Sequence, residues 1–284
     1  MRRILRRITR ISPSATAGNL ILWSWIGMTV FSMLWVIMTS LKTNGEFFQS
    51  VWALPKVAQF ANYMRAWKVV RLQDYFFNSV AITTASTIGT LLVSAMAAYA
   101  LSRFAFRGRR LLLLIFLAGM GIPHQLLLIP LYFLLQDLKL INSLPGLGLV
   151  YIATSISFSI FVLHGFFATL PSEIEEAAEI DGCNAWGVFW KVAVPLAAPG
   201  MLTVGILNAL GTWNEYMLAM TFIRDRNLYT LPVGLYGMQV TMQYTADWTA
   251  LFAGFIISVI PSLLIYVTMQ RYITAGLTMG ALKE

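Results

Sequence analysis

The sequence predicts an all-α membrane protein with six transmembrane helices. Of its 284 residues, 58% are hydrophobic and only 11% are charged, whereas about a quarter of the residues in an ordinary soluble domain are charged. Six stretches stay apolar over about 20 residues, the length that a helix needs to cross the hydrocarbon core of a bilayer. Basic residues gather beside these stretches, as they do on the cytoplasmic side of membrane proteins. Together these observations favour an integral membrane protein over a soluble fold.

The six predicted spans follow one another along the chain, and residues 1–284 are treated as a single transmembrane domain. Prolines interrupt the third span (Pro123 and Pro130) and the sixth (Pro261). We expect kinks there, because membrane helices tolerate proline. The basic N-terminus MRRILRRITR precedes the first span without a small-residue cleavage site, which predicts an uncleaved signal anchor. The spans cover residues 20–38, 80–101, 111–135, 147–167, 198–222 and 251–269.

Lysine and arginine residues predict the orientation of the spans. Five lie among the first ten residues, and four more lie in the short loop after the second span. Positively charged short loops stay in the cytoplasm, and an even number of spans brings both termini to the same side. Both termini and the loop 171–195 are therefore expected to be cytoplasmic. The net charge of +8 belongs to these flanks, since no accompanying motif indicates nucleic-acid binding. The four loop residues are Arg103, Arg107, Arg109 and Arg110.

The start of the loop 171–195 predicts a short helix of about nine residues. Ser172 and Glu175 have the spacing of a capping box, and further acids crowd the first turn, where the helix dipole favours negative charge. Such a helix spans about 13 Å, which is too short to cross a bilayer. It therefore needs a groove in a cytoplasmic partner, and the alternative is a solvated acidic loop. One face recurs at i, i+3, i+4, i+7 spacing and carries Ile174, Ala177, Ala178 and Asp181.

The rest of the loop predicts a turn and a second short helix. Gly182 is expected in the left-handed conformation that ends many helices, and Asn184 is expected to cap the helix that follows. Pro195 is expected to limit the far end of that helix. Its apolar face would be formed by Trp186, Phe189, Trp190 and Ala193.

The loop resembles the cytoplasmic loop of the permease subunits of bacterial ABC importers. In that family Glu-Ala-Ala is followed by Gly after three residues, and then by two spaced aliphatic residues and Pro. Cys183 stands where the family often has Ala, and two Val stand where Ile and Leu are commoner. LSRFAFRGRR, TWNEYMLAMTF, LPVGL, RYITAGLTMGALKE and the outer-loop run WALP…NY…W look like the maltose-permease-type, carbohydrate-uptake branch. The matching loop positions are Glu176, Ala177, Ala178, Gly182, Val192, Val194 and Pro195.

The resemblance implies a permease subunit of an ATP-driven importer in the bacterial inner membrane. The first short helix would then be a coupling helix that docks into a cleft of an ATP-hydrolysing subunit. Expected partners are two ATPase subunits, a second homologous permease subunit, an extracytoplasmic solute-binding protein and membrane lipid. The solute would be a mono- or oligosaccharide, or a polyol-type relative such as a glycerol phosphate. The residues assigned to ATPase coupling are Glu176, Ala177, Ala178, Asp181, Gly182 and Pro195.

The fifth predicted span holds the most polar residues. Asn208, Thr212 and Glu215 share a helical face at i, i+4, i+7, with Asn214 beside them. A charged residue within a span is costly and normally faces a cavity or a partner, so these four residues are candidates for the solute pathway or outer gate. The alternatives for Glu215 are an interfacial acid, or an acid paired with Arg224 or Arg226.

Other patterns favour packing over chemistry. A stripe on the second span predicts close contact with another helix, and His124 and His164 lack a metal-ligand pattern. The chain has no GxxxxGK[ST] loop, so its energy must arrive from another chain, and we expect no enzyme activity, cofactor or metal. The rival hypothesis is a self-powered secondary transporter or channel, with ionisable relays or inverted repeats. An intramembrane enzyme is disfavoured because no GxSxG elbow is present. The stripe is Ser86, Thr90, Ser94 and Ala98.

Overall fold

The computed structural model describes the backbone of residues 13–281. It also describes the side chains of these residues, except those of residues 13–17, 69, 242–245 and 271–281. The basic N-terminal segment of the predicted signal anchor thus lies outside the described residues. Every regular element between residues 13 and 281 is helical. The chain divides into two compact units, one of Met1–Val70 with Gln239–Ile256 and one of Arg71–Met238 with Ile257–Glu284.

Four helices are long and apolar enough to cross a membrane. Two further pairs of helical segments pass the same test only when they are taken together, and they are bent by 98° and 74°. The described part of the chain therefore has four to six candidate spans. Pro261 lies inside the last helix without ending it. The four helices are α2 (Pro13–Ser40), α5 (Leu72–Arg103), α8 (Leu144–Thr169) and α15 (Trp248–Ala281).

The predicted third span is broken rather than kinked. Helix α6 (Arg109–Met120) ends before residues 121–123, and η2 (His124–Leu127) and α7 (Leu128–Asp137) leave at 98°. Pro123 has an extended backbone with ψ 130°, and the residue before a proline is also biased away from the helical conformation. A proline in the first turn of a helix costs little, because its missing N–H would be unpaired there anyway. Pro130 occupies such a place in α7.

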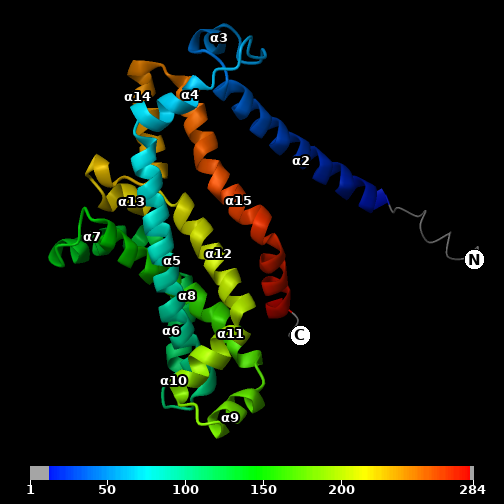
Figure 1. Cartoon of the computed structure of the whole chain (residues 1–284), viewed down its shortest axis with the longest axis vertical. Coiled ribbons are helices and arrows are strands. Elements are labelled where there is room, and N and C mark those ends of the chain that lie inside the picture. The colour runs from blue at the N-terminus through cyan, green and yellow to red at the C-terminus, as the bar shows by residue number, and fades with distance from the viewer. Residues whose placement is uncertain (1–12, 282–284) are drawn as a thin grey trace, which may run out of the picture. The chain divides into compact units, whose positions relative to one another are not determined.

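The core of the second unit is the contact between α5 and α8, with α12 (Ala198–Asn214) beside α5 (Figure 1). Small residues line this contact, which allows the helix backbones to approach closely. The predicted stripe Ser86, Thr90, Ser94 and Ala98 is buried throughout. Below it, apolar side chains of α5, α8 and α12 form one cluster that includes Ala95, Tyr99, Leu163, Phe167 and Val204.

A second apolar cluster joins α7, the start of α8 and α13 (Met217–Phe222). Asn142 fixes the turn before α8 to this region. Its N–H donates to the carbonyl of Phe222 at 2.9 Å, and its Oδ1 accepts from the N–H groups of Arg224 and Asp225 at 2.8 and 2.9 Å. Helix η4 (Arg226–Leu228) follows, and α14 (Leu231–Thr245) leads from the second unit into the first.

The first unit is held by a polar network between α3 (Asn44–Gln49), α4 (Ala61–Met64), η1 (Arg65–Val69) and the start of α15. Asp247 forms an ion pair with Arg65, in which Arg65 Nε lies 3.0 Å from Asp247 Oδ2. Asp247 Oδ1 accepts hydrogen bonds from Arg65 Nη2 at 3.1 Å and from Asn44 Nδ2 at 2.9 Å. Lys42 is fully buried, its Nζ donates to the carbonyls of Ser50 and Val51 at 3.1 and 2.8 Å, and burial lowers its pKa.

Gly146, at the start of α8, has no room for a side chain. A Cβ at this position would clash with the carbonyl oxygen of Leu140 and lie 3.0 Å from Ser143 Oγ. A backbone carbonyl cannot yield as a flexible side chain does, so we expect Gly146→Ala to lower the free energy of unfolding by about 1–3 kcal/mol. The midpoint of thermal unfolding of the full chain in detergent measures this change.

Gly165 provides a matched control on the same helix, because a Cβ there meets nothing within 4 Å. Gly165→Ala is expected to leave the midpoint unchanged or slightly raised, since Ala favours helix more than Gly does. Equal midpoints for the two variants would contradict the packing described for Gly146.

Candidate functional site

Residues 171–195 contain two helical segments separated by a tight turn. Helix α9 spans Ser172–Ile180, and Gly182 follows it at φ +88°. The N–H of Gly182 donates to the carbonyl of Glu179 at 3.0 Å, and that of Cys183 donates to Ala178 at 2.9 Å. This pair of hydrogen bonds is a Schellman motif, in which a left-handed glycine lets the last carbonyls of a helix find partners.

The start of α9 differs from the predicted capping box. Pro171 is the N-cap and makes no side-chain cap, while Ser172 is already helical. Glu175 is buried and turns toward α5, where its carboxylate accepts from Arg103 Nε at 2.9 Å and from Tyr99 OH at 3.2 Å. A charged donor outcompetes a backbone N–H as a partner for a carboxylate, which explains why the box does not form.

The second segment begins as predicted but continues further. Asn184 Oδ1 accepts from the N–H of Gly187 at 2.8 Å and so caps α10 (Ala185–Val188). The π-helical turn η3 (Phe189–Ala193) and α11 (Val194–Leu196) then follow without interruption. The helical run ends at Leu196, one residue beyond the predicted limit at Pro195.

Pro195 is the second residue of α11 and stands near the end of this continuous run. The turn before it is widened, because the N–H of Val194 donates to the carbonyl of Phe189, five residues earlier. The chain bends two residues after Pro195, at Ala197, and the run Ala185–Leu196 meets α12 at 74°. The helical run that starts in the loop is thus joined to α12 by a single bend.

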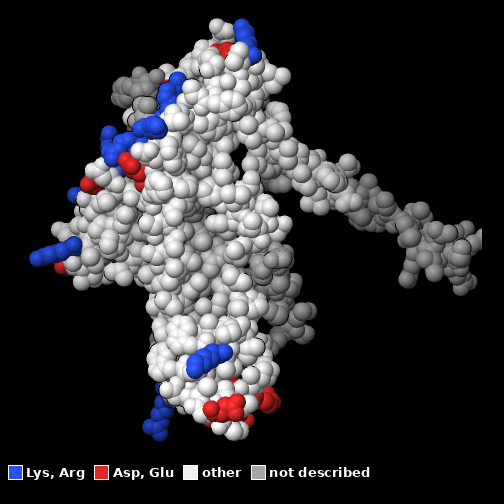
Figure 2. All heavy atoms as spheres, in the orientation of Figure 1, with Lys and Arg blue, Asp and Glu red and all other residues white. Residues whose placement is uncertain are grey.

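The outer surface of α9 carries acids and apolar side chains together. Ile180 is 86% exposed, and Ile174 and Ala177 are also exposed. Figure 2 shows acidic side chains gathered at the lower end of the view, where Figure 1 draws α9. The exposed acids of this helix and its turn are Glu173, Glu176, Glu179 and Asp181.

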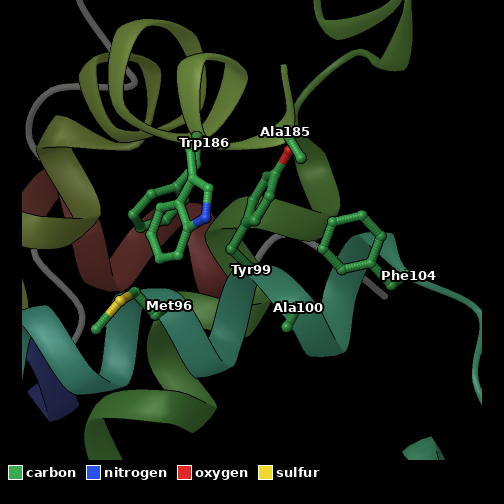
Figure 3. Close-up of a pocket in the computed structure, with 7 residues that line it drawn as sticks. Met96, Tyr99, Ala100, Phe104, Ala185 and Trp186 are labelled. Carbon is green, nitrogen blue, oxygen red and sulfur yellow. The ribbon is translucent and has the colours of Figure 1, made fainter.

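A pocket of about 290 Å³ lies between the end of α5 and α10. Figure 3 shows the ring of Tyr99 among the side chains that line it, between Trp186 and Phe104. The Tyr99 ring packs on Phe104 at 5.9 Å and on Phe189 at 5.2 Å between centroids. The remaining lining residues are Met96, Ala100 and Ala185. The pocket is therefore apolar, and it adjoins the bonds of Glu175.

Glu215 does not share a helical face with Asn208 and Thr212, as the sequence had suggested. Helix α12 ends at Asn214, and Glu215 is extended with φ −73° and ψ 128°. Its carboxylate accepts from the N–H groups of Leu218 and Ala219 at 2.7 and 3.1 Å, and from Tyr151 OH at 2.8 Å. It therefore caps the short helix α13, whose first N–H groups have no partner within the helix.

The predicted fifth span, 198–222, is accordingly two helices with a break at residues 215–216. The contacts described for Glu215 also differ from the alternative pairing with Arg224 or Arg226. Tyr151 lies on α8, 64 residues earlier in the chain, and nothing in the local sequence pattern indicated it as a partner.

The other polar residues of α12 point to different surroundings. Asn208 is buried, and its Nδ2 donates to Ser159 Oγ of α8 at 2.9 Å. Asn214 is exposed and bonds back to the carbonyl of Leu210 at 2.8 Å, while Thr212 is half-buried. His124 and His164 lie on separate elements. Within the described residues no group of three or more His, Cys, Asp or Glu is arranged to hold a metal ion.

Residues 89–279 match a protein family described as the binding-protein-dependent transport system inner membrane component. The chain is 40% identical to the diacetylchitobiose uptake system permease protein NgcG of Streptomyces coelicolor over 98% of this chain and 90% of the relative. It is 33% identical to the trehalose transport system permease protein SugB of Mycobacterium tuberculosis, over 91% and 94% of the two chains.

The fold is similar to one chain in the crystal structure of a bacterial ABC transporter involved in the import of the acidic polysaccharide alginate. The TM-score is 0.77 at 25% identity, and the match covers 92% of this chain and 98% of that one. A family match over most of the chain, relatives similar over nearly their full length and this shared fold agree with one another. The chain therefore belongs to the family of binding-protein-dependent transport system inner membrane components, and it is the permease subunit of such an importer rather than an enzyme.

Proposed function

We propose that this permease carries a carbohydrate into the cytoplasm, and that α9 is the element through which two separate ATPase subunits drive it. The observation that carries the proposal is the outer surface of α9, where apolar and acidic side chains are exposed together on a helix of nine residues. The names of the relatives support the solute class, since they are described as permeases for diacetylchitobiose, trehalose and sulfoquinovosyl glycerol.

The geometry of α9 suits docking into a groove. Ile174 and Ala177 supply an apolar strip along the helix, and Ile180 extends it to the C-terminal end. A groove with an apolar floor would cover this strip, while exposed Glu173 and Glu176 would pair with Arg or Lys at the groove's rim. Hydrogen bonds between ionised partners are about twice as strong as neutral ones. The surface thus favours a basic-rimmed cleft in the ATPase.

The turn after α9 makes the helix a lever. Asp181 and Gly182 fix the angle between α9 and α10, and the run that starts at α10 continues through α11 to the corner with α12. A push on α9 would therefore reach α8 through Leu170 and Pro171, and α12 through this second run. In our proposal Glu176, Ala177 and Ala178 contact the ATPase, while Gly182 and Pro195 shape the linkage.

The proposed topology counts each bent pair as one span and gives six, with both termini in the cytoplasm. The exposed apolar side chains of α2, such as Leu34 at 59% exposure, would face lipid or a second homologous permease in a heterodimer. A solute-binding protein would dock on the extracytoplasmic side. Energy would come from the ATPase subunits, and family membership disfavours the rival hypothesis of a self-powered transporter or channel.

The break between α12 and α13 supports a solute route in its neighbourhood. Irregular backbone at membrane depth is tolerated where it lines a cavity or is buried in protein, and transporter sites often lie at such interruptions. Thr212 and Asn214 precede the break, and Glu215 holds it through its cap on α13. We keep these three residues, with Asn208, as candidates for the pathway or outer gate.

Substitution of Gly182 tests the lever. A Cβ there meets nothing within 4 Å, so only the backbone conformation at φ +88° opposes a side chain. Gly182→Val is expected to distort the turn, because a β-branched residue pays about 1–3 kcal/mol for a left-handed conformation. We expect ATP-dependent uptake of labelled sugars to fall severalfold, with the amount of protein in the membrane unchanged by immunoblot.

Gly182→Asn is the matched control, since Asn adopts the left-handed conformation far more readily than Val. It should transport nearly as well as the native protein. Native-like transport by the Val variant would remove the support for a fixed angle between α9 and α10.

The energy source is tested in proteoliposomes that contain the whole transporter, with binding protein outside. Uptake should require ATP on the ATPase side and should persist when a protonophore collapses the proton gradient. The permease alone should bind no nucleotide, because it lacks a phosphate-binding loop. Uptake that follows the proton gradient and ignores ATP would instead favour a self-powered transporter.

A further inference from the structure

We infer that the ion pair between Arg103 and Glu175 is a positioning contact through which movement of α9 reaches α5. The inference rests on the proposed function, since it needs α9 to be driven by a partner. The chain connects α9 to α8 and, through α10 and α11, to α12. It does not connect α9 to α5, whose last residue, Arg103, precedes Glu175 by 72 residues.

The bonds at this point join three helices. Arg103 Nε donates to Glu175 Oε1 at 2.9 Å, and Arg103 Nη2 donates to the carbonyl of Leu170 at 2.7 Å. Leu170 is the C-cap of α8, so one guanidinium bridges the end of α8 and the first turns of α9. Tyr99, one turn earlier on α5, donates to Glu175 Oε2 at 3.2 Å. Both carboxylate oxygens therefore have donors from α5.

Burial distinguishes this pair from an ordinary surface salt bridge. The side chains of Arg103 and Glu175 are only 16% and 12% exposed. An exposed pair contributes little, whereas removing one partner of a buried pair leaves an unpaired charge away from water. Glu175 is also the one buried acid on α9, and the other acids of that helix are exposed.

Apolar packing around the ion pair holds α5 near the loop but does not set the register between α5 and α9. The ring of Tyr99 lies 5.5 Å from Phe167 of α8 and 5.2 Å from Phe189 of η3, and these contacts already hold α5 near the loop. Aromatic packing sets no hydrogen-bond direction, whereas the Glu175 carboxylate accepts one bond from Arg103 and one from Tyr99 and is thereby held in a defined orientation. The ion pair therefore fixes the register between α9 and the end of α5, which the apolar packing does not fix.

The test measures the amount of sugar imported per ATP hydrolysed. The complete transporter is reconstituted in proteoliposomes with its binding protein and a panel of radiolabelled disaccharides that includes trehalose and diacetylchitobiose. Arg103→Gln removes the pair without touching the aromatic rings. We expect the ATPase subunits to stay bound and ATP hydrolysis to continue, while the ratio falls at least about fivefold, the lower end of typical coupling effects.

Two variants separate positioning from general stability. Arg107→Gln removes an exposed arginine from the same basic loop and should leave the ratio unchanged. The double variant Arg103→Glu with Glu175→Arg restores opposite charges across the contact and should recover part of the lost ratio. A parallel fall in uptake and hydrolysis at constant ratio, or a double variant no better than the single ones, would overturn the inference.

If Arg103→Gln does not accumulate, Arg103→Lys replaces it. Lysine keeps the charge but lacks the fork that reaches Glu175 and Leu170 together, so a smaller loss of the ratio is expected, and an unchanged ratio would refute the inference. If the native transporter imports sugar with ATP and the Arg103 variants keep the native ratio, the ion-pair inference alone is refuted. Native transporter that fails to import any sugar of the panel counts against the proposed function and this inference together.

Discussion

The structure depends on one constraint, which is that a nine-residue helix cannot bury its own apolar surface. Helix α9 exposes Ile174, Ala177 and Ile180 outward among acids, and it is too short to enter a bilayer as a span. Such a helix needs contacts with the rest of the permease on its buried side and a partner on its exposed side. The described residues supply the first, and in our proposal an ATPase subunit supplies the second.

Support from behind comes from three kinds of contact. The Schellman motif at Gly182 ends α9 and pairs its last carbonyls. The aromatic rings of Tyr99, Phe167 and Phe189 pack against one another beside the loop. The ion pair of Glu175 then joins α9 to α5. Because α5 packs along α8 and beside α12, the helices that α9 would move are already in contact with one another. A short lever can therefore act on a packed set of helices.

Local signals in the sequence predicted much of this. The extent of α9, the left-handed Gly182, the cap of Asn184 and the buried stripe on α5 all follow from spacings within a few residues. The predictions were wrong where a residue distant in the sequence supplied the hydrogen-bond partner. Glu175 matched a capping box but bonds to Arg103, and Glu215 matched a helical face but caps α13 beside Tyr151. Pro123 shows a different limit, because the sequence predicted a kink at this proline and the structure has a break with a bend of 98°.

The docking of α9 is tested most directly by site-specific crosslinking in the complete transporter. Cys183 is the only cysteine, so Ala177→Cys is placed in a Cys183→Ser background and treated with a short bifunctional maleimide. A Trp52→Cys variant serves as the reference, because residue 52 is exposed on the segment before α4 and the proposed topology assigns this segment to the extracytoplasmic side. A covalent adduct with the ATPase subunit through position 177, and none through position 52, is the predicted result. Failure of position 177 to reach the ATPase, or its labelling by an impermeant reagent from outside the cell, would contradict the account.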